Sequence, residues 1–255
     1  MTDEYAPMMP EERARQLRVW HDRAYELQRA RLPSRMAFMG LELHIAEDVF
    51  APDTDDIDGD PFHRAVQAEV RAGERVLDMG TGCGVSAILA ARAGAQVVAV
   101  DVNPKAIECA RQNAERNNLK VMPANAPLPN PLPQRGEGEK DRITFLVADI
   151  FDGVEGDFDL IVFDPPFRWF KPRDLLEMGT ADENYRGLTR FMAQAKGRLR
   201  LGGRILLNFG TSGDIDYLYS LIEKAGLAKE VTPYGEATRD GMTASYYTIK
   251  LTADR

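Results

Sequence analysis

The chain contains few cysteines and histidines and no long apolar run. It has two cysteines and three histidines in 255 residues. No stretch of about 18 consecutive apolar residues occurs, so no membrane span is expected, and the charged first thirty residues lack the apolar core of a signal peptide. Cys83 and Cys109 show no Cys/His spacing typical of a metal site. The histidines are scattered, so no catalytic histidine is expected. These absences predict a cytoplasmic protein without a metal.

Basic residues are outnumbered, but their distribution is uneven. The formal net charge of −8 at pH 7 argues against a protein that coats nucleic acid, because phosphates attract a positive surface. Residues 11–35 nevertheless contain seven arginines against four acids, whereas residues 47–60 contain seven acids and no base. A local basic patch near the N-terminus is therefore compatible with the sequence, either to contact the substrate or to cover the sheet.

The N-terminal part shows two kinds of periodicity. Apolar residues recur at helical spacing over residues 10–32 and predict an amphipathic helix. Residues 38–52 alternate and predict a hairpin, and a further helix over residues 61–71 ends near Gly73. We interpret residues 1–72 as a helical and hairpin extension that covers the substrate side of the next domain.

Strands and helices alternate regularly from residue 73 onward. Strands are predicted over 75–80, 95–101, 142–149, 157–164, 203–210 and 245–251, with helices over 84–94, 103–118, 183–199 and 213–226. This alternation predicts an α/β fold with a doubly wound, mostly parallel sheet over residues 73–255. Residues 123–141 contain five prolines and no apolar periodicity, which predicts a surface insertion in this domain.

A glycine-rich turn follows the first predicted strand of the domain. Its sequence "VLDMGTGCGV" places Asp78 before Gly80, Gly82 and Gly84, ahead of a helix whose free amides favour a polar ligand. A dinucleotide fingerprint would need glycine or alanine where Val85 stands. Asp78 would also repel a pyrophosphate, but it can accept a hydrogen bond from an ammonium group. A ligand with an amino-acid end, such as S-adenosylmethionine, fits better.

Two further acids end neighbouring predicted strands. Asp101 lies 21 residues after Gly80 and can accept hydrogen bonds from both hydroxyls of a ribose. Asp149 ends the third strand, where an adenine amino group could be bound. Each acid alone could instead cap a helix. Their shared position at one edge of the sheet favours a ligand site.

These motifs resemble class I S-adenosylmethionine-dependent methyltransferases. The resemblance covers residues 74–251 and includes "VLDMGTGCG", "VADIF", "FDLIVFDPPF" and "LRLGGRILL" in the family's order. The small-methyltransferase group, with the release-factor glutamine N5-methyltransferases, is the most similar. The resemblance implies a seven-stranded Rossmann-like sheet and S-adenosylmethionine as cofactor, with S-adenosylhomocysteine as product. The cofactor-binding residues that it implies are Asp78, Gly80, Thr81, Gly82, Cys83, Gly84, Asp101, Val102, Asn103, Asp149 and Ile150, with Phe50 and Pro52 covering the cofactor or the substrate.

The "DPPF" motif is the candidate acceptor site. Asp164 ends a buried strand, Pro165 and Pro166 fix two backbone φ angles, and Phe167 offers a flat face. The carboxylate and the Pro165 carbonyl could accept both hydrogens of a planar amine while the ring stacks on it. Such positioning directs the nitrogen lone pair at a methyl group. The alternative is a rigid strand-to-loop turn with a surface phenylalanine.

The motif also bears on the substrate. The glutamine enzymes carry asparagine and tyrosine where this chain has Asp164 and Phe167, which argues against glutamine because a carboxylate only accepts hydrogen bonds. Residues 168–187 are long enough for a substrate lid. Trp169 and Phe170, next to three bases, could stack on a nucleotide, but we expect at least one of them to pack against the first helix. The sequence predicts N-methylation of a protein or RNA. A small-molecule acceptor is the alternative, and a nicotinamide oxidoreductase or a non-catalytic subunit fits less well.

Overall fold

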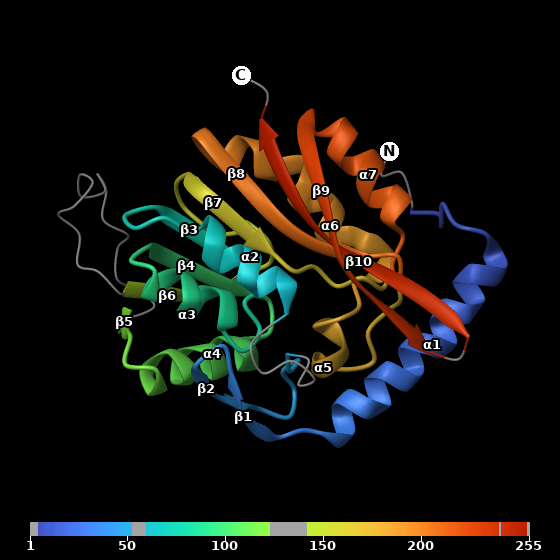
Figure 1. The fold of residues 1–255 in the computed structure, drawn as a ribbon, viewed down its shortest axis with the longest axis horizontal. Coiled ribbons are helices and arrows are strands. Elements are labelled where there is room, and N and C mark those ends of the chain that lie inside the picture. Colours follow the sequence, from blue (N-terminus) through green and yellow to red (C-terminus); the bar gives the residue numbers. More distant parts are fainter. Residues whose placement is uncertain (1–4, 53–59, 123–141, 240, 254–255) are drawn as a thin grey trace.

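The computed structural model describes residues 5–52, 60–122, 142–239 and 241–253. A large mixed sheet forms the centre, with helices on both of its faces and a small hairpin at one side (Figure 1). The strands are β1 (Ser34–Phe38), β2 (Leu41–Ile45), β3 (Arg75–Met79), β4 (Gln96–Asp101), β5 (Lys120–Met122), β6 (Arg142–Val147), β7 (Phe158–Phe163), β8 (Leu199–Gly210), β9 (Leu227–Arg239) and β10 (Met242–Ala253). The α-helices are α1 (Glu11–Ala30), α2 (Pro61–Glu69), α3 (Val85–Arg92), α4 (Pro104–Arg116), α5 (Leu175–Met178), α6 (Arg186–Ala195) and α7 (Ile215–Lys224).

The central sheet has the order β5-β6-β4-β3-β7-β8-β10-β9. The first six strands in this order, from β5 to β8, pair in parallel with one another and include β3 and β4. Strand β10 pairs antiparallel with β8 and β9. The α/β class and the mostly parallel sheet are confirmed, but the sheet has eight strands instead of the expected seven. The periodicity missed β5, which has three residues, and β9, in which Pro233 and Gly235 interrupt the strand pattern.

Alternate residues of the strands enter two hydrophobic cores. Val76 of β3 and Leu160 of β7 belong to the core shared with α2, α3, α4 and the β1–β2 hairpin. Their sequence neighbours Leu77 and Ile161 belong to the core shared with α1, α6 and α7. Burial on both faces explains why these strands read as continuous apolar runs. The two helical layers fix the strand ends, where the candidate site residues lie.

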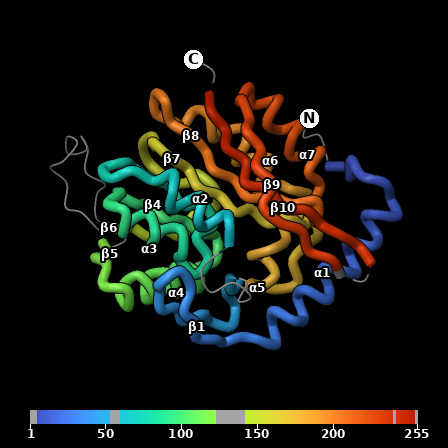
Figure 2. Tube along the Cα trace, viewed as in Figure 1, coloured from blue at the N-terminus to red at the C-terminus, as the bar shows by residue number. Residues whose placement is uncertain are grey.

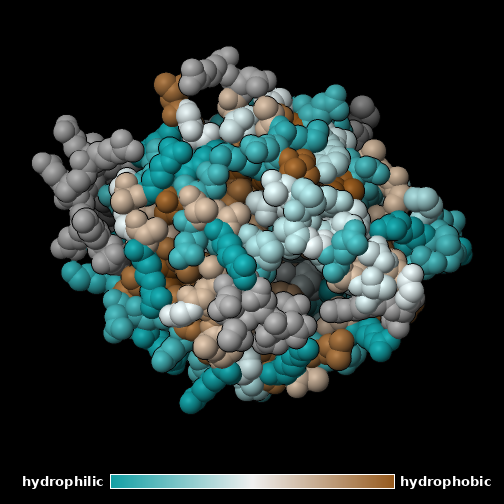
Figure 3. Space-filling view, in the orientation of Figure 1, coloured by the Kyte–Doolittle hydropathy of each residue, from teal (hydrophilic) through white to brown (hydrophobic). Residues whose placement is uncertain are grey.

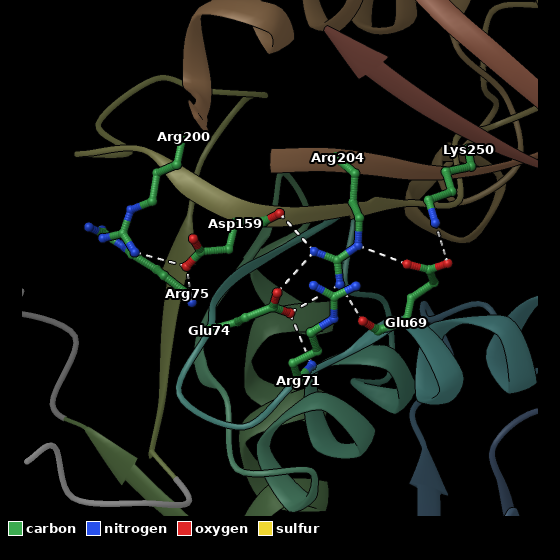
Figure 4. Close-up of polar contacts among 8 residues, drawn as sticks. All are labelled: Glu69, Arg71, Glu74, Arg75, Asp159, Arg200, Arg204 and Lys250. Atoms are coloured by element: carbon green, nitrogen blue, oxygen red, sulfur yellow. Dashed lines mark hydrogen bonds and ion pairs between the residues drawn. The ribbon is translucent and has the colours of Figure 1, made fainter. Parts of the chain in front are cut away.

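A network of charged residues joins α2 to the ends of the strands opposite the candidate site (Figure 4). The buried Arg204 of β8 donates hydrogen bonds to the side chains of Glu69 and Glu74, at 2.8 to 3.1 Å. Lys250 of β10 donates to Glu69 at 2.6 Å, and Asp159 of β7 accepts from the guanidinium of Arg200 and the backbone amide of Arg75. Because each buried charge has a partner, the network can anchor the C-terminal end of α2.

Helix α1 runs along the outside of the molecule, from the region of α7 towards the hairpin (Figure 2). The chain before it is tied to Asp214, which accepts hydrogen bonds from the Tyr5 hydroxyl at 2.9 Å and the Met8 amide at 2.7 Å. Further along α1, the Arg18 guanidinium lies 4.1 Å from the ring centroid of Phe170. The first part of the predicted extension therefore contacts the segment that follows the DPPF motif.

The last helix of the predicted extension packs into one of the two cores of the sheet. Phe62 and Val66 of α2 are buried in the same core as α3 and β3. On the face in Figure 3, strongly hydrophobic residues occur in small groups among hydrophilic ones. Within the described ranges, no helix has the length and apolar character needed to cross a membrane.

Candidate functional site

The glycine-rich turn connects β3 to α3 at the carboxyl end of the sheet. Gly80, Gly82 and Gly84 have positive φ values of 67°, 55° and 95°. Gly84 is the N-cap of α3 and lies tightly against α4, since a Cβ at this position would stand 3.0 Å from the Cβ of Ala110. At Gly82 a Cβ would meet no atom of the described residues within 4 Å. The turn is thus closely packed on one side and open on the other.

Asp78 is buried beneath this turn. Its side chain is 4% exposed and accepts hydrogen bonds from the Thr81 hydroxyl at 2.6 Å and the Ala87 amide at 3.0 Å. Burial raises the pKa of Asp78 to about 7, because the partly opposing effects of Thr81, His63 and the Ala87 amide do not offset the loss of water. A cation placed beside Asp78 would restore its ionised form.

Asp101 ends β4 next to the turn. One carboxylate oxygen accepts from the amide of Gly82 and the other from the amide of Asn103, both at 2.9 Å. Burial raises the pKa of Asp101 despite these amides. Since an ionised carboxylate has about four lone-pair directions, Asp101 keeps capacity to accept from a ligand hydroxyl.

Several predicted cofactor residues have structural roles. Asn103 caps α4, because its side-chain oxygen accepts from the Lys105 amide while its amide group donates to the Asp48 carbonyl. The Cys83 side chain is buried, and its carbonyl accepts from Asn113. Val102 is 47% exposed beside them. These residues shape the turn and the start of α4.

Asp149 and the residues around it lie nearer the surface. The Asp149 side chain is 52% exposed and forms an ion pair with Arg190 of α6. Ile150 follows with a positive φ of 56°. Phe50 is 40% exposed and lies against Gly179, with the half-buried Pro52 two residues later. No described contact joins these residues to Asp78 or Asp101, so their predicted contact with a cofactor stays a prediction.

Asp164 follows β7 directly and is exposed to solvent at the sheet edge. Its Oδ1 accepts a hydrogen bond of 2.9 Å from Asn208 of β8. The protein atoms around the carboxylate raise its pKa to about 6, with desolvation as the main cause and Asp60 adding to it, against His63 and Asn208. Although water reaches this group, the protein therefore hinders its ionisation.

The rest of the DPPF motif is packed against the molecule. Pro165 is buried, and Pro166 and Phe167 are half-buried. The Phe167 ring lies 5.0 Å from that of Phe209, and its carbonyl accepts from the Tyr185 hydroxyl at 2.5 Å. A freely exposed phenylalanine at the end of the motif is therefore excluded.

The segment after the motif is also anchored. Trp169 is 5% exposed and contacts the rings of Tyr5 and Tyr185, and Phe170 lies against His21 and Arg18 of α1. The expected packing of Trp169 or Phe170 against the first helix is confirmed.

His63 is a residue that the sequence pattern did not single out. It lies in the first turn of α2, is 13% exposed, and its Nδ1 is 2.7 Å from Asp60. Burial lowers the pKa of His63, but the hydrogen bond and charge of Asp60, with the charges of Asp164 and Asp78, outweigh this and raise it above the usual value. His63 thus connects Asp78 and Asp164 electrostatically. The helix-starting pattern "DPFH" was the available signal.

Asn208 and Tyr234 were also missed. Asn208 is buried in β8, and its Oδ1 accepts a hydrogen bond of 2.9 Å from the hydroxyl of Tyr234 in β9. A polar residue inside the apolar run "ILLNFG" was a signal for Asn208. Tyr234 could not be found in this way because β9 itself was not predicted.

Other candidate sites are absent from the described part of the chain or lie elsewhere. No group of three or more His, Cys, Asp or Glu residues there could hold a metal ion. A recess of about 420 Å³ lies between the β1–β2 hairpin and the end of α4, lined by residues such as Arg35 and Arg116. It contains none of the acids at the sheet edge, so the chemistry points to the edge.

The sequence model of the methyltransferase small domain family matches residues 40–212 of the chain. This range includes the glycine-rich turn, the acids at the sheet edge and the DPPF motif. The chain belongs to this family. It is 33% identical over 93 residues to a putative protein N5-glutamine methyltransferase of Methanocaldococcus jannaschii, over 36% of each chain. It is 31% identical over 154 residues to the release factor glutamine methyltransferase of Rhodopirellula baltica, over 54% of this chain and 45% of that protein.

Solved structures of methyltransferases share the fold of this protein. The 16S rRNA N2 G1207 methyltransferase of T. thermophilus, in complex with AdoMet and guanosine, aligns with a TM-score of 0.58 and 22% identity. The alignment covers 87% of this chain and 50% of that one. The chain spans less than half the length of the two curated relatives above. These relationships establish the family and the fold.

Proposed function

We propose that the protein is an S-adenosylmethionine-dependent methyltransferase that methylates an amide or amino nitrogen of a protein or an RNA. The observation that supports this most is the grouping of Asp78, Asp101 and Asp164 around an open glycine turn. All three acids lie at the carboxyl ends of neighbouring parallel strands, where ligands of such sheets bind. Membership of the methyltransferase small domain family agrees with this reading.

The residues at the turn suit the cofactor. The buried carboxylate of Asp78 can accept a hydrogen bond from the ammonium group, and Asp101 retains lone pairs for the ribose hydroxyls. Open space beside Gly82 lets a ligand approach the backbone. The bound cofactor supplies a methyl group on a sulfonium. We also assign the remaining predicted cofactor residues to the walls of this site.

The DPPF motif orients the acceptor in this proposal. Asp164 and the carbonyl of Pro165 accept the hydrogens of a planar nitrogen, and Phe167 packs against its face. When it is ionised, Asp164 can only accept hydrogen bonds. It therefore selects a substrate nitrogen that carries hydrogens to donate. Restricting the nitrogen to one orientation can contribute much of the rate enhancement of a displacement.

The relatives support a protein or an RNA as the acceptor. One relative is a putative protein N5-glutamine methyltransferase, the other is a release factor glutamine methyltransferase, and the structural neighbour is a 16S rRNA methyltransferase. We propose that residues 1–72 cover the substrate side of the domain of residues 73–255, which the contacts of α1 with Phe170 and Asp174 support. The free thiols of Cys83 and Cys109 suit a reducing cytoplasm.

Calorimetric titration with S-adenosylhomocysteine and with NADH tests the cofactor. We expect S-adenosylhomocysteine to bind and NADH not to bind; binding of NADH alone would refute the proposal. Asp164→Ala should abolish methyl transfer and keep the affinity for S-adenosylhomocysteine within a few-fold, because Asp164 faces the acceptor.

The acceptor is tested with S-adenosyl-L-methionine that carries a tritiated methyl group. The tritiated methyl group should be transferred to macromolecules of a cell extract. Treatment of the extract with either RNase or protease should abolish this incorporation. Label that passes a size filter instead would identify a small-molecule acceptor and overturn the macromolecular assignment.

A further inference from the structure

A hydrogen-bond chain runs from β9 to the carboxylate of the DPPF motif. The Tyr234 hydroxyl donates to Oδ1 of Asn208 at 2.9 Å, and Nδ2 of Asn208 donates to Oδ1 of Asp164 at 2.9 Å. An ionised carboxylate cannot donate, so Asn208 must direct its amide nitrogen towards Asp164. Tyr234 reinforces this orientation by donating to the amide oxygen. The chain therefore has one direction.

This direction leaves one oxygen of Asp164 for another partner. Asn208 occupies Oδ1, and within the described residues no hydrogen bond reaches Oδ2. The Asn208 side chain is buried, with 8% of the residue exposed, and cannot easily turn away. The hydrogen bond from Asn208 therefore restricts the orientation of the carboxylate and leaves Oδ2 available to a donor that approaches the sheet edge.

The β9–β10 hairpin also provides an aromatic wall beside this carboxylate. Tyr246 of β10 lies 6.1 Å from Phe167 and 6.2 Å from Tyr234 between ring centroids, and the two tyrosine rings are stacked with an interplanar angle of 22°. Gly210 makes room for this arrangement, because a Cβ there would overlap the ring of Tyr246. Three rings thus follow one another from the hairpin to the DPPF motif.

We propose that Asn208 and Tyr234 are positioning residues that hold Asp164 so that its Oδ2 receives an N–H of a flat acceptor. The inference rests on the proposed methyl transfer, and it makes the β9–β10 hairpin part of the acceptor site. The acceptor class that fits is a planar amide or a ring amine with at least one hydrogen to donate. It lies between the aromatic wall and the carboxylate.

The effect of the hydrogen-bond chain can be measured as a change in the pKa of Asp164. His63 and Asp60, at the start of α2, and Asn208 of β8 act on its pKa. Tyr234 of β9 is close enough for the charge of Asp164 to raise its own pKa. The hydrogen bond from Asn208 lowers the pKa of Asp164. Removal of this donor should therefore raise the pKa above its present value of about 6.

The first experiment is a pH titration of the aspartate side-chain carbons by ¹³C NMR in the full chain, with Asp164→Ala for assignment. Asn208→Leu should raise the pKa of Asp164, and Tyr234→Phe should raise it less. Tyr219→Phe removes a hydroxyl on α7 that is not part of the hydrogen-bond chain, and it should leave the pKa of Asp164 unchanged. An unchanged pKa in both Asn208→Leu and Tyr234→Phe would overturn the inference. If Asn208→Leu does not fold, the milder Tyr234→Phe still decides.

The second experiment measures tritiated methyl transfer into the macromolecules of an extract. We expect kcat to fall about ten-fold in Asn208→Leu and less in Tyr234→Phe, with the KM for S-adenosylmethionine unchanged, because one hydrogen bond is removed from the positioning of Asp164. Tyr219→Phe should match the wild type. Wild-type rates in both test variants would refute this inference. Failure of the wild type to bind S-adenosylhomocysteine would instead refute the proposed function.

Discussion

Lowering the pH from about 7.5 to about 6 should weaken cofactor binding, because Asp78 must be ionised to accept the ammonium group. Burial raises the pKa of Asp78 to about 7 in the free protein. A ligand that favours the ionised form binds well above this pKa and progressively less well below it. Binding at lower pH must then be accompanied by release of a proton.

The size of the effect follows from the ionised fraction. With a pKa of about 7, Asp78 is roughly three-quarters ionised at pH 7.5 and roughly one-tenth ionised at pH 6. The dissociation constant for S-adenosylhomocysteine should therefore rise about eight-fold, or ~1.3 kcal/mol. The ammonium group of the ligand stands beside a free carboxylate and stays protonated over this pH range, so it does not cause the loss.

Calorimetry in two buffers of different ionisation enthalpy measures both the affinity and the released proton. Asp78→Asn should bind more weakly and show a flat pH profile over this range. Asp164→Ala is the matched control: its carboxylate also has a raised pKa, but it faces the acceptor, so its removal should keep the slope. A flat wild-type profile, without proton release at pH 6, would refute the placement of Asp78 beside the ammonium group.

Local patterns made much of the fold and part of the site predictable. Strands β3, β4, β6, β7 and β8 are apolar because both faces are buried, and glycines mark the turn that follows β3. Asp78, Asp101 and Asp164 were predicted to lie at one edge because parallel strands bring their carboxyl ends together, and the order of the strands places them there. The prediction was good where a few consecutive residues determine the structure.

Tertiary contacts made the rest unpredictable. β9 pairs with β10 across a strand that contains Pro233 and Gly235, so its local sequence argues against its structure. Tyr234 reaches Asp164 only through this pairing, and His63 reaches it only because α2 packs on the sheet. Conversely, Asn103 matches a ligand position in sequence, yet its side chain caps α4. The same residue types form hydrogen bonds within the protein and to a ligand, so the sequence alone does not distinguish the two roles.

Three further variants test the turn, the charge network and the remaining acid. Gly84→Ala should destabilise the fold by about 2–4 kcal/mol in denaturant unfolding, whereas Gly202→Ala, also at positive φ but with open space, should cost about 1 kcal/mol. Arg204→Met should cost about 3–5 kcal/mol in the same assay, because it leaves the buried Glu74 without its cationic partner, whereas Glu69 keeps Lys250. Asp149→Ala should weaken S-adenosylhomocysteine binding about ten-fold if its carboxylate accepts the adenine amino group. Arg190→Ala removes the exposed ion pairs with Asp149 and Asp152 and should leave the affinity within two-fold or tighten it, since the Asp149 carboxylate is released for the ligand. Equal affinities of the wild type and Asp149→Ala would mean that Asp149 serves the ion pair and not the cofactor.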